Sequence, residues 1–107
     1  MNADLAFIDA NKVRDYLLAP SHPVGRFKAK FFAALGCTQL EWGLLSSNLL
    51  EIARVGQIVP GQPSGYGQKY EASGTLIGPN GRKARVTTVW VVRPDEQVPR
   101  FVTAFPE

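Results

Sequence analysis

The sequence predicts one α+β domain, residues 1–107, in which three N-terminal helices pack on a C-terminal antiparallel sheet of three to four strands. A length of 107 residues suits a single domain. In the first half of the chain apolar residues recur with helical spacing, whereas in the second half they alternate and β-branched residues accumulate. Helical and strand segments do not alternate, which is typical of antiparallel α+β folds. We expect helices within 9–56, a loop at 57–67 and the sheet at 68–106.

Three segments have the features of helices. The first, 9–18, places its apolar residues on one stripe. The second, 26–35, repeats phenylalanine or leucine every four residues and ends before Gly36, which can adopt the backbone angles of a helix terminator. The third follows a Thr-x-x-Glu capping box at 38–41 and ends at Gly56.

The second half of the chain predicts a loop and then strands. Residues 56–67 contain two prolines and four glycines, so we expect a mobile surface loop there. Strands are expected at 69–77, 82–93 and 100–105, with a turn at the sequence Gly-Pro-Asn-Gly, 78–81. The second of these strands has apolar residues on both faces, so we expect it in the centre of the sheet.

Composition and charge narrow the classes of function. A net charge of +3 and a pI near 9.3 favour an acidic partner, such as a nucleic acid, an anionic membrane or an acidic protein. One cysteine, one methionine and one histidine argue against a disulfide or a dedicated metal site. No stretch has the length of a membrane span, and the first residues lack signal-peptide features. We therefore expect a cytoplasmic protein without cofactor or membrane partner, unless the chain is the tip of a longer secreted protein.

His22 is the first candidate functional residue, because histidine titrates near neutral pH. Arg26, Lys28 and Lys30 follow it on the second predicted helix. A helix N-terminus beside several cations favours an anion such as phosphate. The alternative is that His22 caps the helix and the cations form a solvated face.

A second set of polar residues lies on the predicted strands. Cations and hydroxyls on one sheet face suit a phosphodiester, because they stabilise and orient its developing charge. Neighbouring strand residues point to opposite faces, so either Thr87 or Thr88 faces such a site, depending on register. Tyr66 can stack on a base. The alternative is an ordinary solvated strand face. The set comprises Lys69, Arg85, Thr87, Thr88, Arg100 and Thr103.

Several strings in the sequence resemble a family of uncharacterised bacterial domains. The strings are HPVGRFKAKFF at 22–32, YGQKY at 66–70, TVW at 88–90 and PRFVTAFP at 99–106. Where the family has Tyr before the final proline, this chain has Phe105. Such domains look like the tips of polymorphic toxins, and their helices followed by a sheet resemble the barnase–EndoU–colicin–RelE group of ribonucleases.

The resemblance implies a metal-independent endoribonuclease that cuts cellular RNA such as tRNA by 2′-hydroxyl attack and is neutralised by an immunity or antitoxin protein. It implies His22 as general acid or base, Lys28, Lys69 and Arg100 as phosphate-binding cations, and Thr88 and Thr103 as orienting hydroxyls. With one histidine, the second proton-transfer group must be a lysine, a tyrosine or the substrate. The residues expected to contact RNA are Arg26, Lys30, Tyr66, Lys69 and Arg85.

A non-catalytic interaction module remains the alternative function. It would be either the immunity or antitoxin partner of a toxin or an RNA-binding domain without chemistry. The absence of a self-evident catalytic pair and the modest charge favour it.

Overall fold

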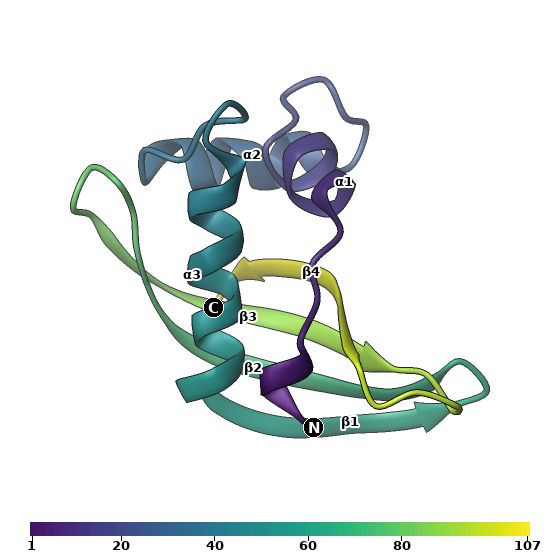
Figure 1. Cartoon of the computed structure of the whole chain (residues 1–107). Helices are drawn as coiled ribbons and strands as arrows, with labels where there is room; N and C mark the ends of the chain where they lie inside the picture. Colours follow the sequence, from purple (N-terminus) through teal and green to yellow (C-terminus); the bar gives the residue numbers. More distant parts are fainter.

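The structure, a computed structural model, describes all residues, 1–107. Its four strands form one antiparallel sheet in the order β1-β2-β3-β4 (Figure 1). The helical elements are η1 (Ala3–Leu5), α1 (Ala10–Lys12), the π-helical η2 (Val13–Leu17), α2 (Gly25–Ala34) and α3 (Trp42–Val55). The strands are β1 (Gln57–Ser64), β2 (Gly67–Ile77), β3 (Lys83–Val92) and β4 (Pro99–Pro106).

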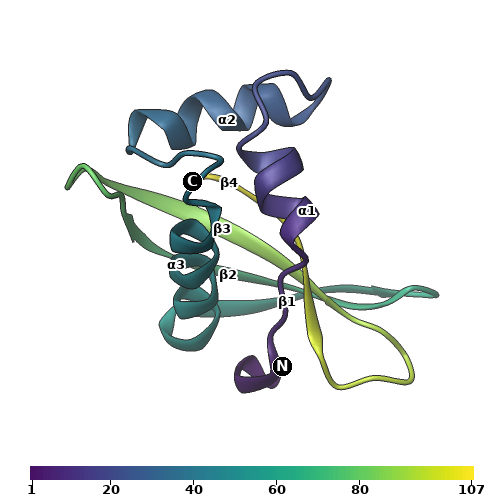
Figure 2. The ribbon, with the colours of Figure 1, turned by 45° about the horizontal axis from the view of Figure 1, so that its top comes forward.

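The helices gather on one side of the sheet (Figure 1, Figure 2). α3 lies against β2, where the side chain of Ile52 is beside Gly74. The core between the layers is built around Trp90, Phe32 and Leu49, which are fully buried, and apolar burial of this kind is the main favourable term in folding. No helix has both the length and the apolar character that crossing a lipid bilayer requires.

Most of the predicted elements are confirmed to within a few residues. α2 and α3 coincide with the second and third predicted helices. The predicted capping box is displaced: Thr38 Oγ1 accepts a hydrogen bond from the Glu41 amide at 3.2 Å, but α3 begins at Trp42 with Glu41 as its N-cap and without a side-chain cap, so Thr38 closes the turn before the helix. β3 lies between β2 and β4, so the expectation of a central strand is confirmed.

The prediction of a regular helix at 9–18 is wrong in its second half. Only Ala10–Lys12 is α-helical, and the chain then widens into the π turn η2, in which the Leu18 amide donates to the Val13 carbonyl at 2.9 Å. Such turns are rare and occur most often at functional sites. The turn contains Tyr16, which forms part of the candidate site below.

The prediction of a loop at 57–67 is also wrong, because Gln57–Ser64 forms the strand β1. β1 lies at the edge of the sheet, and its register against β2 shifts between Pro60 and Pro63. An edge strand needs ladder hydrogen bonds on one side only, so prolines are tolerated there, particularly at an irregularity. The composition that suggested a loop is therefore compatible with an edge strand.

Two features of β4 position the residues of the candidate site. Val89 lies opposite Thr103 and Trp90 opposite Phe101, so Val102 has no partner and forms a β-bulge. On the outer side of β4, the Phe7 amide donates to the Pro99 carbonyl and the Phe101 amide donates to the Phe7 carbonyl, both at 2.9 Å. The first residues of the chain are thereby fixed beside this end of the sheet.

Candidate functional site

Three polar side chains from distant parts of the chain meet in one hydrogen-bonded cluster. The Lys28 ammonium donates to Tyr16 Oη at 2.7 Å and to Thr103 Oγ1 at 2.6 Å, and the two hydroxyls are 3.3 Å apart. Tyr16 comes from the π turn, Lys28 from α2 and Thr103 from β4 beside the bulge. All three are half-buried, so their hydrogen bonds are partly shielded from water. We call this set the Tyr16–Lys28–Thr103 cluster.

The cluster changes the acidity of the phenol. Burial on its own raises the pKa of Tyr16, but the hydrogen bonds from Lys28 and Thr103 and the positive charges of Lys28 and Lys12 outweigh it. The net effect is that the pKa of Tyr16 lies below its ordinary value of 10.0. A phenol stabilised as phenolate by an adjacent ammonium can accept a proton from a substrate hydroxyl.

The cluster opens onto a cleft of about 640 Å³. Tyr16 and Thr103 line the cleft, whereas Lys28 does not and lies behind them. The exposed Lys12 side chain also lines the cleft, where it can attract an anion. The lining residues are Asn11, Lys12, Asp15, Tyr16, His22, Val24, Val102 and Thr103.

His22 lines the same cleft, but its ring also caps α2. Nδ1 accepts hydrogen bonds from the amides of Val24 at 3.0 Å and Gly25 at 2.9 Å, and the ring stands edge-on to Tyr16 with centroids 5.1 Å apart. A nitrogen that accepts two amides uses its lone pair, so the proton of the neutral ring is on Nε2. In this conformation His22 can donate a hydrogen bond from Nε2.

Thr88 does not line the cleft. Its side chain is fully buried, and its hydroxyl donates to the Ala72 carbonyl at 2.7 Å and accepts from Trp90 Nε1 at 2.7 Å. The strand register turns Thr88 toward the core, and its hydroxyl satisfies a buried indole N–H. Thr88 is therefore a core residue, and the expectation that it orients a phosphate is corrected.

Arg100 lies in a smaller hollow next to the cleft. Its guanidinium donates to both carboxylate oxygens of Glu96, at 2.9 and 3.2 Å. This bidentate contact holds the pKa of Glu96 below its ordinary range. Arg100 is thus separate from the Tyr16–Lys28–Thr103 cluster.

The residues expected to contact RNA are spread over three surfaces. Arg26 and Lys30 line a hollow between α2 and the turn before α3. Tyr66 and Lys69 line another, over β1 and β2. Arg85 is paired with Glu107 at 3.0 Å. None of these five residues lines the cleft.

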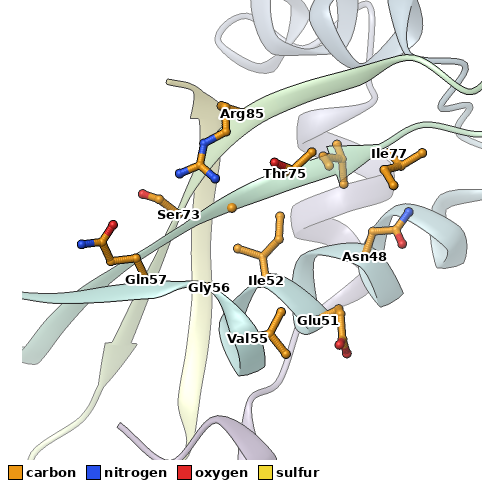
Figure 3. A pocket seen from close by; sticks show the side chains of 12 residues that line it. Asn48, Glu51, Ile52, Val55, Gly56, Gln57, Ser73, Thr75, Ile77 and Arg85 are labelled. Atoms are coloured by element: carbon orange, nitrogen blue, oxygen red, sulfur yellow. The ribbon is translucent and has the colours of Figure 1, made fainter.

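A further hollow, of about 510 Å³, lies between α3 and an unpaired edge of β2 (Figure 3). Pairing of β1 with β2 stops at Gln57 opposite Ser73, so Gly74–Ile77 has a neighbouring strand on one side only. Figure 3 shows Ile52 and Val55 of α3 lining the hollow below this edge. The hollow contains no cluster of acid–base groups comparable to that around Tyr16, so we assign the chemistry to the cleft and consider this edge as a contact surface.

Two of the residues in the cleft carry no direct functional signal in the sequence. Tyr16 was assigned to the apolar stripe of the first helix, and its hydroxyl was the one polar group on that stripe. Lys12 has an ordinary surface position and became relevant only through the fold. No group of His, Cys, Asp and Glu side chains in the structure is arranged to hold a metal ion.

The sequence matches, over residues 1–107, the family described as "Domain of unknown function (DUF6883)". Among curated proteins, no sequence matches the chain. The fold is similar to one chain of a solved contact-dependent growth inhibition toxin–immunity protein complex from Klebsiella pneumoniae 342. That similarity has a TM-score of 0.73 at 22% identity and covers 94% of this chain and 98% of the other. At this identity the likeness establishes a shared fold.

Proposed function

The chain belongs to the DUF6883 family, and from its cleft we propose that it is a metal-independent endoribonuclease of a toxin–immunity system, acting on cellular RNA such as tRNA. The observation that carries this proposal is the Tyr16–Lys28–Thr103 cluster, with an ammonium and two hydroxyls within hydrogen-bond distance at an open cleft. The net charge of +3 and the fold shared with a chain of a toxin–immunity complex support it.

In the proposed reaction the Tyr16 phenolate accepts the proton of a ribose 2′-hydroxyl. The 2′-oxygen then attacks the adjacent phosphorus, and the bond from phosphorus to the 5′-oxygen breaks. The Thr103 hydroxyl, which lines the cleft, gives its proton to the departing 5′-oxygen and takes one from the Lys28 ammonium behind it, so the products are a 2′,3′-cyclic phosphate and a 5′-hydroxyl. Thr103 orients the phosphate, and Lys12 and the Nε2–H of His22 stabilise its charge.

The cluster also restores its own protonation state. After one turnover Tyr16 holds a proton that Lys28 has lost, and the two atoms are joined by the 2.7 Å hydrogen bond. Transfer of the proton along that bond returns the phenolate and the ammonium. In the proposed reaction a tyrosine and a lysine are therefore the proton-transfer groups, and His22 donates a hydrogen bond in place of the expected role as general acid or base.

We expect Tyr16→Phe to lower kcat/KM on a single-stranded oligoribonucleotide by about 100-fold to 10 000-fold, the usual contribution of a general base. In the native protein the rate should rise with pH, because the phenolate is the active form, and the lowered pKa of Tyr16 places the midpoint below 10.0. The variant should lack this rise. The measurement is cleavage in EDTA as a function of pH, corrected for hydroxide-catalysed hydrolysis.

A control and a suitable variant of His22 make this experiment specific. Tyr66→Phe removes the hydroxyl of a tyrosine that is 86% exposed and lies outside the cleft, so this variant should leave the rate unchanged. For His22, alanine would also remove the cap of α2, whereas His22→Asn retains an acceptor and removes Nε2–H. A Tyr16→Phe variant with native rate and pH profile would exclude the phenol as base. Intact total bacterial RNA at high native protein concentration would exclude the nuclease.

The second candidate function, a non-catalytic interaction module, is favoured by the unpaired edge of β2. An exposed strand edge is a template for an added strand from another protein.

We expect Ile77→Lys to weaken binding of the cognate partner protein about tenfold or more, because a charge at the edge disfavours strand addition. Val59→Lys is the control, since both side chains are 54% exposed and Val59 lies on β1. Native mass spectrometry measures the complex, and equal binding by both variants would argue against this surface.

A further inference from the structure

A hollow of about 200 Å³ lies next to the cleft and contains an exposed aromatic ring. The side chains of Lys12 and Val102 line both the hollow and the cleft, so the two form one continuous surface. The ring is that of Phe7, which is 47% exposed although phenylalanine is usually buried in a core. The lining residues are Phe7, Asp9, Lys12, Val91, Arg93, Arg100, Phe101 and Val102.

The backbone holds the Phe7 ring in a fixed place. Its amide and its carbonyl are each bonded to β4, at Pro99 and Phe101. The ring is therefore presented from the edge of the sheet and not from a free chain end. Such fixing lowers the entropy cost of binding a ligand against the ring.

Cations surround the ring. The Arg100 guanidinium lies 5.9 Å from the ring centroid, and Arg93 and Lys12 line the same hollow. Glu96 and Asp9 are the carboxylates nearby: Glu96 is hydrogen-bonded to Arg100 and lies 3.8 Å from the Arg93 guanidinium, and Asp9 accepts from the Asn11 amide. Three cations against two carboxylates leave a positive excess around an aromatic face.

We propose that this hollow is a nucleotide subsite, in which an unpaired RNA base stacks on Phe7 while Arg93 and Lys12 bind the flanking phosphates. An aromatic ring among cations is how proteins bind single-stranded nucleic acid, because every base has a π-face and every linkage a charge. The inference rests on the proposed function, since it gives the strand a path from the Tyr16–Lys28–Thr103 cluster across Lys12 to Phe7. It narrows the substrate class to RNA with an unpaired base next to the cleaved phosphate.

A non-cleavable ligand tests binding apart from chemistry. The probe is a fluorescein-labelled single-stranded oligoribonucleotide with 2′-O-methyl groups, which lacks the attacking hydroxyl, and the readout is fluorescence anisotropy. Phe7→Ala and Phe7→Leu should weaken binding about fivefold or more, because stacking on an aromatic ring is lost. Phe7→Leu keeps an apolar side chain, so a loss in both variants reports the ring and not the fold.

Phe27→Ala is the matched control. The Phe27 ring is also exposed beneath an arginine, with the Arg26 guanidinium 4.7 Å from its centroid, but it lies on α2 and lines neither the cleft nor the hollow. We expect this variant to bind the probe as the native protein does. A duplex of the same sequence should bind equally to the native protein and to Phe7→Ala, because its bases are paired.

The outcomes separate the subsite from the nuclease. If the native protein cleaves RNA but Phe7→Ala, Phe7→Leu and Phe27→Ala all bind the probe like the native protein, the subsite is wrong and the proposed function stands. If the native protein neither binds the probe nor cleaves RNA, the proposed function fails and the subsite fails with it. A defect shared by Phe27→Ala would assign the effect to general surface apolarity and would also overturn the subsite.

Discussion

Replacing Lys28 by methionine should lower the rate of RNA cleavage by about 100-fold to 10 000-fold while leaving the protein at least as stable as before. The ammonium donates one of the hydrogen bonds that lower the pKa of Tyr16, and in the proposed reaction it supplies, through Thr103, the proton of the leaving oxygen. Its positive charge is half-buried, and its hydrogen bonds go to two hydroxyls and to no carboxylate. Removing a charge held in this way relieves a desolvation cost.

The measurements are kcat on the oligoribonucleotide and the midpoint of thermal unfolding. Lys30→Met is the matched control, because Lys30 is exposed on the same helix, whereas the hydrogen bonds to Tyr16 and Thr103 come from Lys28. We expect this control to keep native activity. Native activity in Lys28→Met would refute the assigned role of the ammonium. A parallel loss of activity and stability would instead identify Lys28 as a structural residue.

Gly25→Ala should be the most destabilising single methyl addition near the cleft. An added Cβ would lie 1.9 Å from the Tyr16 carbonyl oxygen, which is backbone and cannot rotate away. Overpacking of this severity costs about 3 kcal/mol, and for a domain of this size that lowers Tm by roughly 10–20 °C. Because the clash moves the π turn, we also expect the Tyr16–Lys28–Thr103 cluster to separate and cleavage to be lost.

Gly43→Ala is the comparison that isolates the clash. A Cβ at Gly43 has no heavy atom within 4 Å, and the residue lies in the first turn of α3. Alanine is favoured over glycine in a helix by up to about 1 kcal/mol, so this variant should be unchanged or slightly more stable. Differential scanning calorimetry of both variants measures the difference. Equal Tm values would mean that Tyr16 and α2 adjust without cost.

The elements that could be predicted from the sequence are those with a regular apolar pattern. The Phe and Leu repeat of α2, the end of α3 at Gly56 and the β-branched run of β3 are all local signals. The sequence pattern does not predict β1, because proline argues against a strand only where both sides of the strand are hydrogen-bonded to neighbours. β1 is an edge strand, with a neighbour on one side only. Whether a strand is an edge is decided by the rest of the sheet.

The candidate site could be predicted only in part, for a related reason. Three of the expected residues lie at the candidate site: His22 and Thr103 line the cleft, and Lys28 lies behind it, where it donates a hydrogen bond to Thr103. Tyr16 was hidden in an apolar stripe, because a tyrosine on such a stripe packs its ring and can still use its hydroxyl. Thr88 was misplaced because the choice of sheet face depends on a register that a single strand does not define.

The distances along the chain between the cluster residues have a consequence for when the proposed site can form. Tyr16 and Lys28 are 12 positions apart, but Thr103 is 87 positions from Tyr16 and 75 from Lys28. Contacts so far apart carry a large loop-closure cost and form late in folding. During synthesis, every helix leaves the ribosome before β4 does. The cluster therefore cannot assemble before β4 is in place, so the proposed chemistry would require completion of the fold.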